Sequence, residues 1–175
     1  MLSLSLFSSS QRISVAIYEH RKLKEYVTER VADNKIDRIF LLIKRILRKN
    51  KGKIEKIYFS KGPGSFTAIR SIKAIAQGIS LISNAKIITL NDFDIYLGNL
   101  AERADDVIVF YQNINRKFFY QYFRRDGDKY KPASKFFIGD ARKLNEFILD
   151  LKKDKTRLVF TTNFKKNIRL LEDVD

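Results

Sequence analysis

The spacing of apolar residues changes within the first third of the chain, from a period of two to a period near that of a helix. Residues 2–8 and 13–19 alternate between apolar and polar positions, as half-buried strands do. The polar residues 8–12 between them are expected to form a turn, and residues 23–27 are a third candidate strand. The pattern predicts an antiparallel meander at the start of the chain.

Helical spacing begins after Asp33, where six apolar residues recur over about four turns. Asn34 is the candidate N-cap and residues 50–52 are the expected stop. Beyond this helix, the pattern predicts a strand over 54–59, a turn over 61–64, a helix over about 65–83, a strand over 86–90 and a helical segment over 91–103.

The second half repeats this order of elements without a visible sequence repeat. Strands are predicted over 107–111, 118–124 and 130–138, with Asp126-Gly127 as a hairpin turn, then a helix over 144–151 and a strand over 157–161. Two successive βββαβ units are the layout of the actin-like ATPase (ribonuclease H-like) fold. We therefore expect an α/β protein of this kind, with one domain over 1–103 and a reduced second domain over 104–175.

Composition is that of a folded chain, because 45% of the 175 residues are hydrophobic and can bury one large core or two small ones. The chain has no cysteine, which excludes disulfides, thiolate metal sites and thiol nucleophiles and suits the cytoplasm. The first ten residues lack the basic region and long apolar core of a signal peptide. No apolar run approaches the roughly 20 residues that span a bilayer, so no membrane association is expected.

The net charge is strongly positive, with 35 Lys and Arg against 20 Asp and Glu, a formal charge of +15. Such a field attracts polyanions and makes RNA a plausible partner, although basic residues spread along a chain also occur on ordinary solvated surfaces. Residues 116–125 interleave basic and aromatic side chains, as in proteins that stack bases. Strand alternation sends Phe119 and Phe123 to one face and Tyr120 and Tyr122 to the other, so at least one face is expected to be core.

Candidate catalytic groups are few. The one histidine, His20, follows Glu19 at the end of a predicted strand and is expected to be a surface side chain. No H-x-x-x-H spacing is present, which argues against a metalloprotease. We interpret the carboxylate pairs as caps, solubilising groups and terminal charge; they are Asp92 with Asp94, Asp105 with Asp106, and Glu172 with Asp173. The sequence thus predicts no catalytic residue and no metal site.

The segment SKGPGSFTAIR, residues 60–70, lies between a predicted strand and a predicted helix. Gly62 and Gly64 permit backbone angles closed to other residues, Pro63 stiffens the turn, and Ser65 can cap the helix. A glycine-rich turn before a helix either holds a phosphate or simply sets where the helix begins. Neither a Walker Lys-Ser pair nor G-x-G-x-x-G follows it, which leaves the phosphate site as the weaker interpretation.

This segment and the Ala76-Gln77-Gly78 that follows resemble the G-R-G-P-G-S-F-T-G-x-R…A-Q-G signature of the bacterial TsaB (YeaZ) family. The segment SVAI over 14–17 is similar to the S-V-A-L of that family's second strand. The resemblance is good over residues 2–90 and weak beyond them. The residues that match the turn of the signature are Gly62, Pro63, Gly64, Ser65, Phe66 and Thr67.

The resemblance implies a non-catalytic scaffold that activates a TsaD-like catalytic subunit, in the synthesis of threonylcarbamoyladenosine next to the tRNA anticodon. ATP and metal would then belong to the partner, and this chain is expected to bind no cofactor itself. A TsaE-like ATPase is a further partner that the resemblance implies, tRNA would be reached through the complex, and a homodimer is the alternative assembly.

Two helices of TsaB-like proteins form a bundle with the partner, and the resemblance places the same role on the two long helices here. For each residue, ordinary core packing is the competing interpretation. The residues expected to contact the partner are Ile39, Ile43 and Ile46 of the first helix and Arg70, Ala74, Gln77 and Gly78 of the second.

Departures from the family pattern identify a divergent, shortened member. Phe7 stands where relatives have an aspartate that serves metal and phosphates in active actin-like ATPases. Asn113 and Asn115 replace an Asp and an Arg, and Lys117-Phe118 replaces Gly-Glu. Beside the scaffold, two hypotheses remain: a basic RNA-binding module, and a stand-alone actin-like ATPase, against which Phe7 argues.

Overall fold

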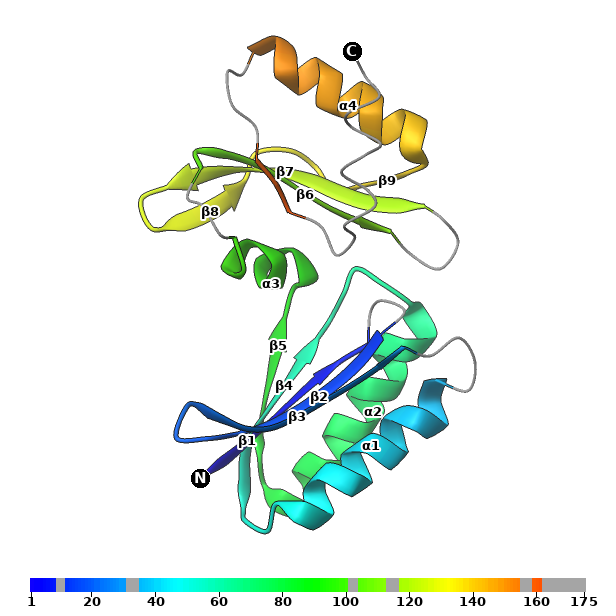
Figure 1. Cartoon of the computed structure of the whole chain (residues 1–175), viewed down its shortest axis with the longest axis vertical. Coiled ribbons are helices and arrows are strands. Elements are labelled where there is room, and N and C mark those ends of the chain that lie inside the picture. The colour runs from blue at the N-terminus through cyan, green and yellow to red at the C-terminus, as the bar shows by residue number, and fades with distance from the viewer. Residues whose placement is uncertain (9–11, 31–34, 101–103, 113–116, 155–158, 162–175) are drawn as a thin grey trace. The chain divides into compact units, whose positions relative to one another are not determined.

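The protein is described by a computed structural model over residues 1–8, 12–30, 35–100, 104–112, 117–154 and 159–161. Its contacts divide the chain into two compact units, Met1–Asp92 and Phe93–Asp175 (Figure 1). Each unit consists of one sheet with helices packed on it. Within the described ranges, no helix combines the length and the apolar character needed to cross a bilayer.

A five-stranded mixed sheet forms the body of the first unit, in the order β3-β2-β1-β4-β5. Its strands are β1 (Leu2–Phe7), β2 (Arg12–Glu19), β3 (Lys22–Arg30), β4 (Ile54–Ser60) and β5 (Lys86–Leu90). The first three are antiparallel, which confirms the predicted meander, and β4 and β5 run parallel to β1. His20 and Arg21 join β2 to β3 with φ of 48° and 66°, the backbone of a two-residue hairpin.

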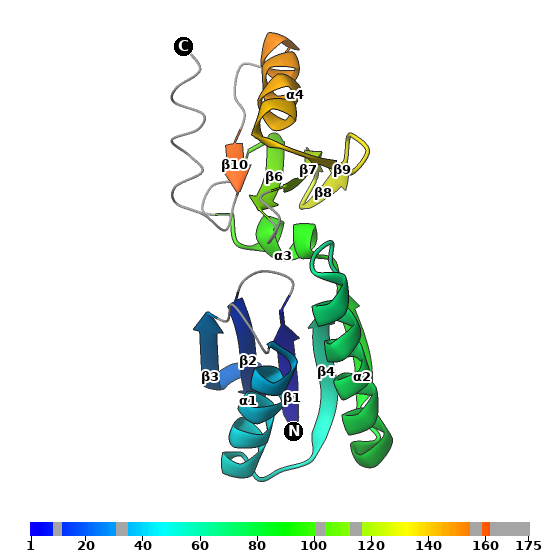
Figure 2. The same cartoon turned by 90° about the vertical axis from the view of Figure 1, so that its right-hand side faces the viewer.

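Helices α1 (Lys35–Lys49) and α2 (Phe66–Ser83) cover one face of this sheet (Figure 2). Asn50 ends α1, since its backbone N–H and its Nδ2 both donate to the carbonyl of Ile46, at 3.1 and 2.8 Å. Asn34, the predicted cap, and residues 9–11 of the predicted first turn lie outside the described residues. The core between sheet and helices includes Leu2, Leu4, Leu6, Ile13, Val15, Ile17, Ile39, Ile43, Ile46, Ile57 and Ile72.

The second unit repeats the strand arrangement of the first. Its elements are α3 (Asp92–Gly98), β6 (Asp106–Gln112), β7 (Phe118–Asp126), β8 (Lys129–Pro132), β9 (Phe137–Gly139), α4 (Ala141–Asp154) and β10 (Val159–Thr161). The sheet order is β10-β6-β7-β8, with β6 parallel to β10 and antiparallel to β7. This matches β4-β1-β2-β3 of the first unit and is the predicted α/β, actin-like topology.

Two elements of the second unit differ from their prediction. The single strand expected over 130–138 is divided into β8 and β9, which pair with different parts of β7. Pro132 ends β8 because it has no N–H for the ladder, and the N–H of Ala133 donates to the carbonyl of Tyr122 at 2.9 Å. Helix α3 ends at Gly98, well before residue 103; residues 101–103 are outside the described ranges.

The core of the second unit lies on both faces of its sheet. On one face Phe93 and Leu97 of α3 pack with alternate residues of β6 and β7. On the other face Leu144 and Ile148 of α4 pack with the remaining ones. Figure 1 shows α3 and α4 on opposite faces of this sheet. Because α3 contributes to this core, the contacts divide the chain at Asp92, whereas the sequence pattern counted α3 with the first half.

Candidate partner-binding groove

The turn that precedes α2 is attached to the end of β5 by hydrogen bonds. Buried Ser60 donates its hydroxyl to the buried carboxylate of Asp92, and its Oγ accepts from the Gly62 N–H at 3.2 Å. The Asp92 N–H donates to the Gly62 carbonyl at 2.9 Å, and the Lys61 N–H donates to the Leu90 carbonyl at 2.8 Å. The chain therefore enters α2 from a fixed position.

Close packing of the turn explains its glycine. Gly62 has φ of +95°, and a Cβ there would lie 2.8 Å from Cδ1 of Ile69. Ser65 caps α2 as predicted, because its side chain accepts from the Ala68 N–H at 3.5 Å and its carbonyl accepts from the Ile69 N–H at 2.9 Å. The amides of Lys61, Gly62, Ala68 and Ile69 thus donate to the chain itself, which favours a structural turn over a phosphate site.

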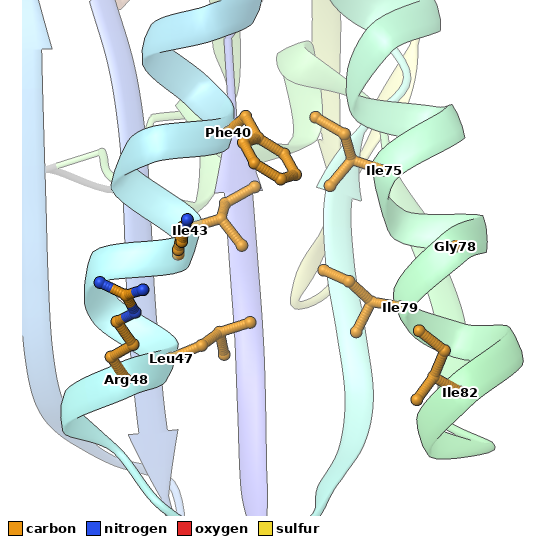
Figure 3. Close-up of a pocket in the computed structure, with 9 residues that line it drawn as sticks. Phe40, Ile43, Leu47, Arg48, Ile75, Gly78, Ile79 and Ile82 are labelled. Atoms are coloured by element: carbon orange, nitrogen blue, oxygen red, sulfur yellow. The ribbon is translucent and has the colours of Figure 1, made fainter.

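Between α1 and α2 lies an apolar groove with a volume of about 520 Å³. Figure 3 shows Phe40, Ile43 and Leu47 of α1 pointing toward α2, and Ile75, Ile79 and Ile82 of α2 pointing back. We call this surface the helix groove. Its lining residues are Phe40, Ile43, Lys44, Leu47, Arg48, Ile75, Gly78, Ile79 and Ile82.

Large apolar side chains at this surface remain in contact with water. Phe40 is 56% exposed, Ile82 is 91% exposed, and the adjoining Leu41 and Leu81 are also exposed. Single exposed apolar residues are ordinary, but several gathered around a groove mark a surface that another molecule covers. The helix groove has this character, and its volume and apolar lining suit a helix or a long apolar side chain.

The residues predicted to face a partner have three different positions. Ile43 and Gly78 line the helix groove. Ile39 and Ile46 lie in the core beneath it, fully buried, so they hold α1 on the sheet. Arg70, Ala74 and Gln77 are exposed on α2 beyond the groove lining. The Arg70 guanidinium lies 3.7 Å from the centroid of the Phe66 ring.

Most apolar residues of the groove were not singled out by sequence reasoning. Ile75 and Ile79 stand at the edge of the face of α2 that covers the sheet, and both are half-buried. Ile75, Ile79 and Ile82, at i, i+4 and i+7, form an apolar stripe along α2. This stripe lies beside the one formed by the fully buried Ile72 and Ala76. The neighbouring stripe is the pattern from which the groove wall could have been found.

Groups that might suggest chemistry have structural partners. Tyr122 donates its hydroxyl to Asp106, and Arg125 lies 3.8 Å from Asp105. Burial, together with the hydrogen bond to Asp106, raises the pKa of the Tyr122 hydroxyl. His20 is exposed in its hairpin turn. Asn113, Asn115, Glu172 and Asp173 lie outside the described residues.

The residues present do not match a metal–nucleotide site. Strand β1 ends at Phe7, whose side chain has no oxygen to offer a metal ion or its water ligands. Among the residues that the structure describes, no three His, Cys, Asp or Glu side chains gather closely enough to hold a metal ion.

The aromatic strand β7 is enclosed on both faces. Phe119 and Phe123 lie in the core on the α3 side, and Phe118, Tyr120 and Tyr122 lie in the core on the α4 side. Each of these side chains is at most 7% exposed. The sequence allowed one face to stack on bases, and that interpretation is wrong because α4 covers the second face.

Residues 13–112 match the family model described as TsaD, tRNA N6-adenosine threonylcarbamoyltransferase. Two curated relatives are both called tRNA threonylcarbamoyladenosine biosynthesis protein TsaB. The protein from Buchnera aphidicola subsp. Acyrthosiphon pisum is 35% identical over 91 residues, which are 50% of this chain and 41% of that one. The protein from the subspecies Baizongia pistaciae is 29% identical over 154 residues, which are 84% of this chain and 70% of that one.

Two solved structures share the fold. YeaZ from Pseudomonas aeruginosa superposes with a TM-score of 0.64 at 17% identity, covering 82% of this chain and 69% of that one. A Pseudomonas aeruginosa protein described as similar to the peptidase YEAZ gives a TM-score of 0.65 at 16% identity, covering 80% and 67%. These matches confirm the α/β, actin-like ATPase (ribonuclease H-like) fold that the order of elements predicted.

Proposed function

The chain belongs to the TsaB (YeaZ) family, and from this premise we propose that it is a scaffold subunit in tRNA threonylcarbamoyladenosine synthesis. The relatives' names supply the pathway. The single observation that supports a scaffold is the helix groove, an apolar surface that the described part of the chain leaves open to water. The whole activity of that pathway would then require a second protein.

The partner we propose is a TsaD-like catalytic subunit, with one of its helices seated in the helix groove. Gly78 lies on the groove wall, and a Cβ added to it would meet nothing within 4 Å. A residue without a side chain permits the backbone of another helix to approach closely. Around this point Phe40 and Ile82 offer apolar surface whose burial would stabilise the association by about 25 cal/mol per Å².

The side chains of each protein indicate which of the two would bind the nucleotide and the metal ion. By the family resemblance, Phe7 stands where active actin-like ATPases have an aspartate, and its side chain offers no oxygen ligand to a metal ion or a phosphate-bound cation. In the proposed assembly, ATP, the metal ion and the tRNA adenosine are bound by the TsaD-like subunit, and this chain stabilises the partner's active form. Any TsaE-like ATPase and the tRNA would join the assembled complex, in the cytoplasm.

Gly78→Arg tests this placement by putting a long cationic side chain at the groove wall. The free chain should fold normally, because the space at Gly78 is open. Co-purification with the TsaD-like subunit should be lost. The matched control is Gly98→Arg, which makes the same change at a second glycine with open space, in the second unit. If the Gly78 variant co-purifies as well as the control, the proposed surface is wrong.

The alternative is a basic RNA-binding module, which the net charge of +15 favours. Burial of the aromatic residues of β7 removes the base-stacking surface that such a module would use. Contacts to phosphates alone would give affinity that falls steeply with salt. A titration of the isolated chain with tRNA should therefore show weak binding that disappears at physiological salt; tight binding there would favour the module.

A further inference from the structure

The helix groove has an uneven distribution of charge. Its lining includes two cations of α1, Lys44 and Arg48, and no carboxylate. Helix α2 has no Asp or Glu along its length, and α1 has only Asp37, which does not line the groove. A molecule seated in the groove would therefore meet apolar side chains bordered by positive charge.

Two of the other cations of α1 are neutralised within the chain, and Arg45 is exposed outside the groove lining. Arg38 forms an ion pair with Glu29 of β3 at 2.7 Å, and Lys49 pairs with Glu25 of the same strand at 3.7 Å. In the described part of the chain, Lys44 and Arg48 form no ion pair, and both are exposed. The side of α1 that faces β3 thus has its own anions, whereas the side that faces the groove lacks them.

We infer that the helix groove binds a partner helix whose apolar ridge is flanked by carboxylates opposite Lys44 and Arg48. This inference rests on the proposed function and adds the chemistry of the bound surface. A helix that covers the groove removes water from both cations, and a desolvated cation without an anion opposes binding. Carboxylates of the partner opposite Lys44 and Arg48 offset the desolvation of the two cations and fix the register of the partner helix.

The spacing of the two cations determines the spacing of the anions. Lys44 and Arg48 are four residues apart, one turn of α1, so their side chains emerge about 6 Å from each other. A partner helix that lies along α1 matches them with two Asp or Glu residues three or four positions apart. Apolar residues of the same helix then face Phe40, Ile79 and Ile82 across the groove (Figure 3).

A second copy of this chain fits the groove less well. Helix α2 of a second copy brings no carboxylate, and α1 brings only Asp37. In an antiparallel pair of α1 helices, Asp37 can neutralise Arg48 of the other copy. Lys44 would then face cations or apolar side chains near the two-fold axis, because an isologous contact presents the same residues twice.

Phosphates of a nucleic acid would also neutralise the two cations, but they leave the apolar lining uncovered. The groove is apolar over most of its lining, and Ile82, almost fully exposed, gains nothing from a sugar-phosphate backbone. A protein helix satisfies both the charges and the apolar surface. The observations therefore favour an acidic-flanked helix over RNA.

The test reverses both charges in the variant Lys44→Glu/Arg48→Glu and measures its dissociation constant with the TsaD-like subunit at low and high salt. Affinity at low salt should fall by about tenfold to a hundredfold. The matched control, Lys51→Glu/Lys53→Glu, makes the same change of net charge at exposed residues outside the groove lining. Its affinity should stay within about threefold of the unmodified chain.

The outcomes separate the two proposals. If the unmodified chain binds the TsaD-like subunit and the groove variant binds equally well, this inference is overturned while the proposed function stands. If the unmodified chain does not bind that subunit at any salt, both fail. Self-association of the chain at low salt as tight as its binding to the subunit, or tRNA binding that the groove variant alone abolishes, would also overturn it.

Discussion

Substitution of Gly78 by alanine should change the stability of the free chain and the stability of the complex in opposite directions. Gly78 lies in the interior of α2, on an exposed face, with no heavy atom within 4 Å of an added Cβ. Glycine in a helix interior is about 0.8–1.0 kcal/mol less favourable than alanine. The new methyl group meets no obstacle, so most of this difference should appear as stability of the first unit.

The expected gain for the free chain is roughly 0.5–1 kcal/mol, because Gly→Ala also reduces the freedom of the unfolded chain. For a unit of this size, 1 kcal/mol corresponds to about 4–8 °C in Tm, so the first unit should melt about 2–8 °C higher. In the complex, the same methyl group stands where the partner helix approaches. Forcing one methylene into a packed contact costs about 1–3 kcal/mol, so affinity should fall by about fivefold or more.

Two assays are needed to see the opposite signs. Thermal unfolding of the free chain, followed by circular dichroism, measures the first effect, and calorimetric titration with the TsaD-like subunit measures the second. Gly98→Ala, at the end of α3, is a control for binding because it lies in the second unit. A variant that is stabilised and binds with unchanged affinity would refute the close approach at Gly78. A variant that is destabilised would refute the open space from which the argument starts.

Three further outcomes follow from the contacts. Gly62→Ala should destabilise the first unit by about 1–3 kcal/mol in urea unfolding, because φ of +95° and the contact with Ile69 both oppose a Cβ. Ser60→Ala should lower the free energy of unfolding by about 2–3 kcal/mol in the same assay, because it removes a donor from the buried Asp92 carboxylate. Ser71→Ala is the control: the hydrogen bond of that hydroxyl is exposed, so its loss should change the free energy of unfolding by less than about 0.5 kcal/mol. Burial raises the pKa of Tyr122, and the neutral form is therefore favoured in the folded state; this contribution is present below the unfolded pKa near 10 and is lost as pH rises through the folded value. Stability of the second unit should accordingly fall above about pH 10, less steeply in Tyr122→Phe, and equal alkaline slopes would contradict the argument.

Much of the fold was predictable because each half of the chain keeps its pattern locally consistent. Alternation in β1 and β2 places Leu4 and Val15 on the helix side of the sheet, and the helical period of α1 places Ile39 and Ile46 on the sheet. Ser65 caps α2 where the turn chemistry indicated. The predicted strand 130–138 is divided because its two pieces pair with separate parts of β7, β8 with residues 123–126 and β9 with residues 118–120.

The candidate site was predictable only in part, because a groove between two helices is a property of neither helix alone. The family resemblance places Gly78 among the residues expected to contact a partner, and Gly78 is exposed on α2. The periodicity of α1 could not tell whether Ile43 would face the sheet or the groove, because a single apolar stripe of this helix contacts both. The distance between α1 and α2, which sets the width of the opening, depends on the sheet beneath them.

The aromatic strand and the basic helix show why residue type alone does not identify a binding surface. Residues 118–123 have the composition of a base-stacking platform, yet α4, which begins at Ala141, covers the face that would have to stay open. Cations of α1 appear equivalent in the sequence, yet β3 supplies anions to Arg38 and Lys49 and leaves Lys44 and Arg48 to the groove. In both cases a distant segment decides which side chains remain for a partner. Helix α4 buries the aromatic rings, and β3 leaves Lys44 and Arg48 without anions. The surface that remains for a partner is therefore the apolar groove with its two cations, and it suits an acidic-flanked protein helix.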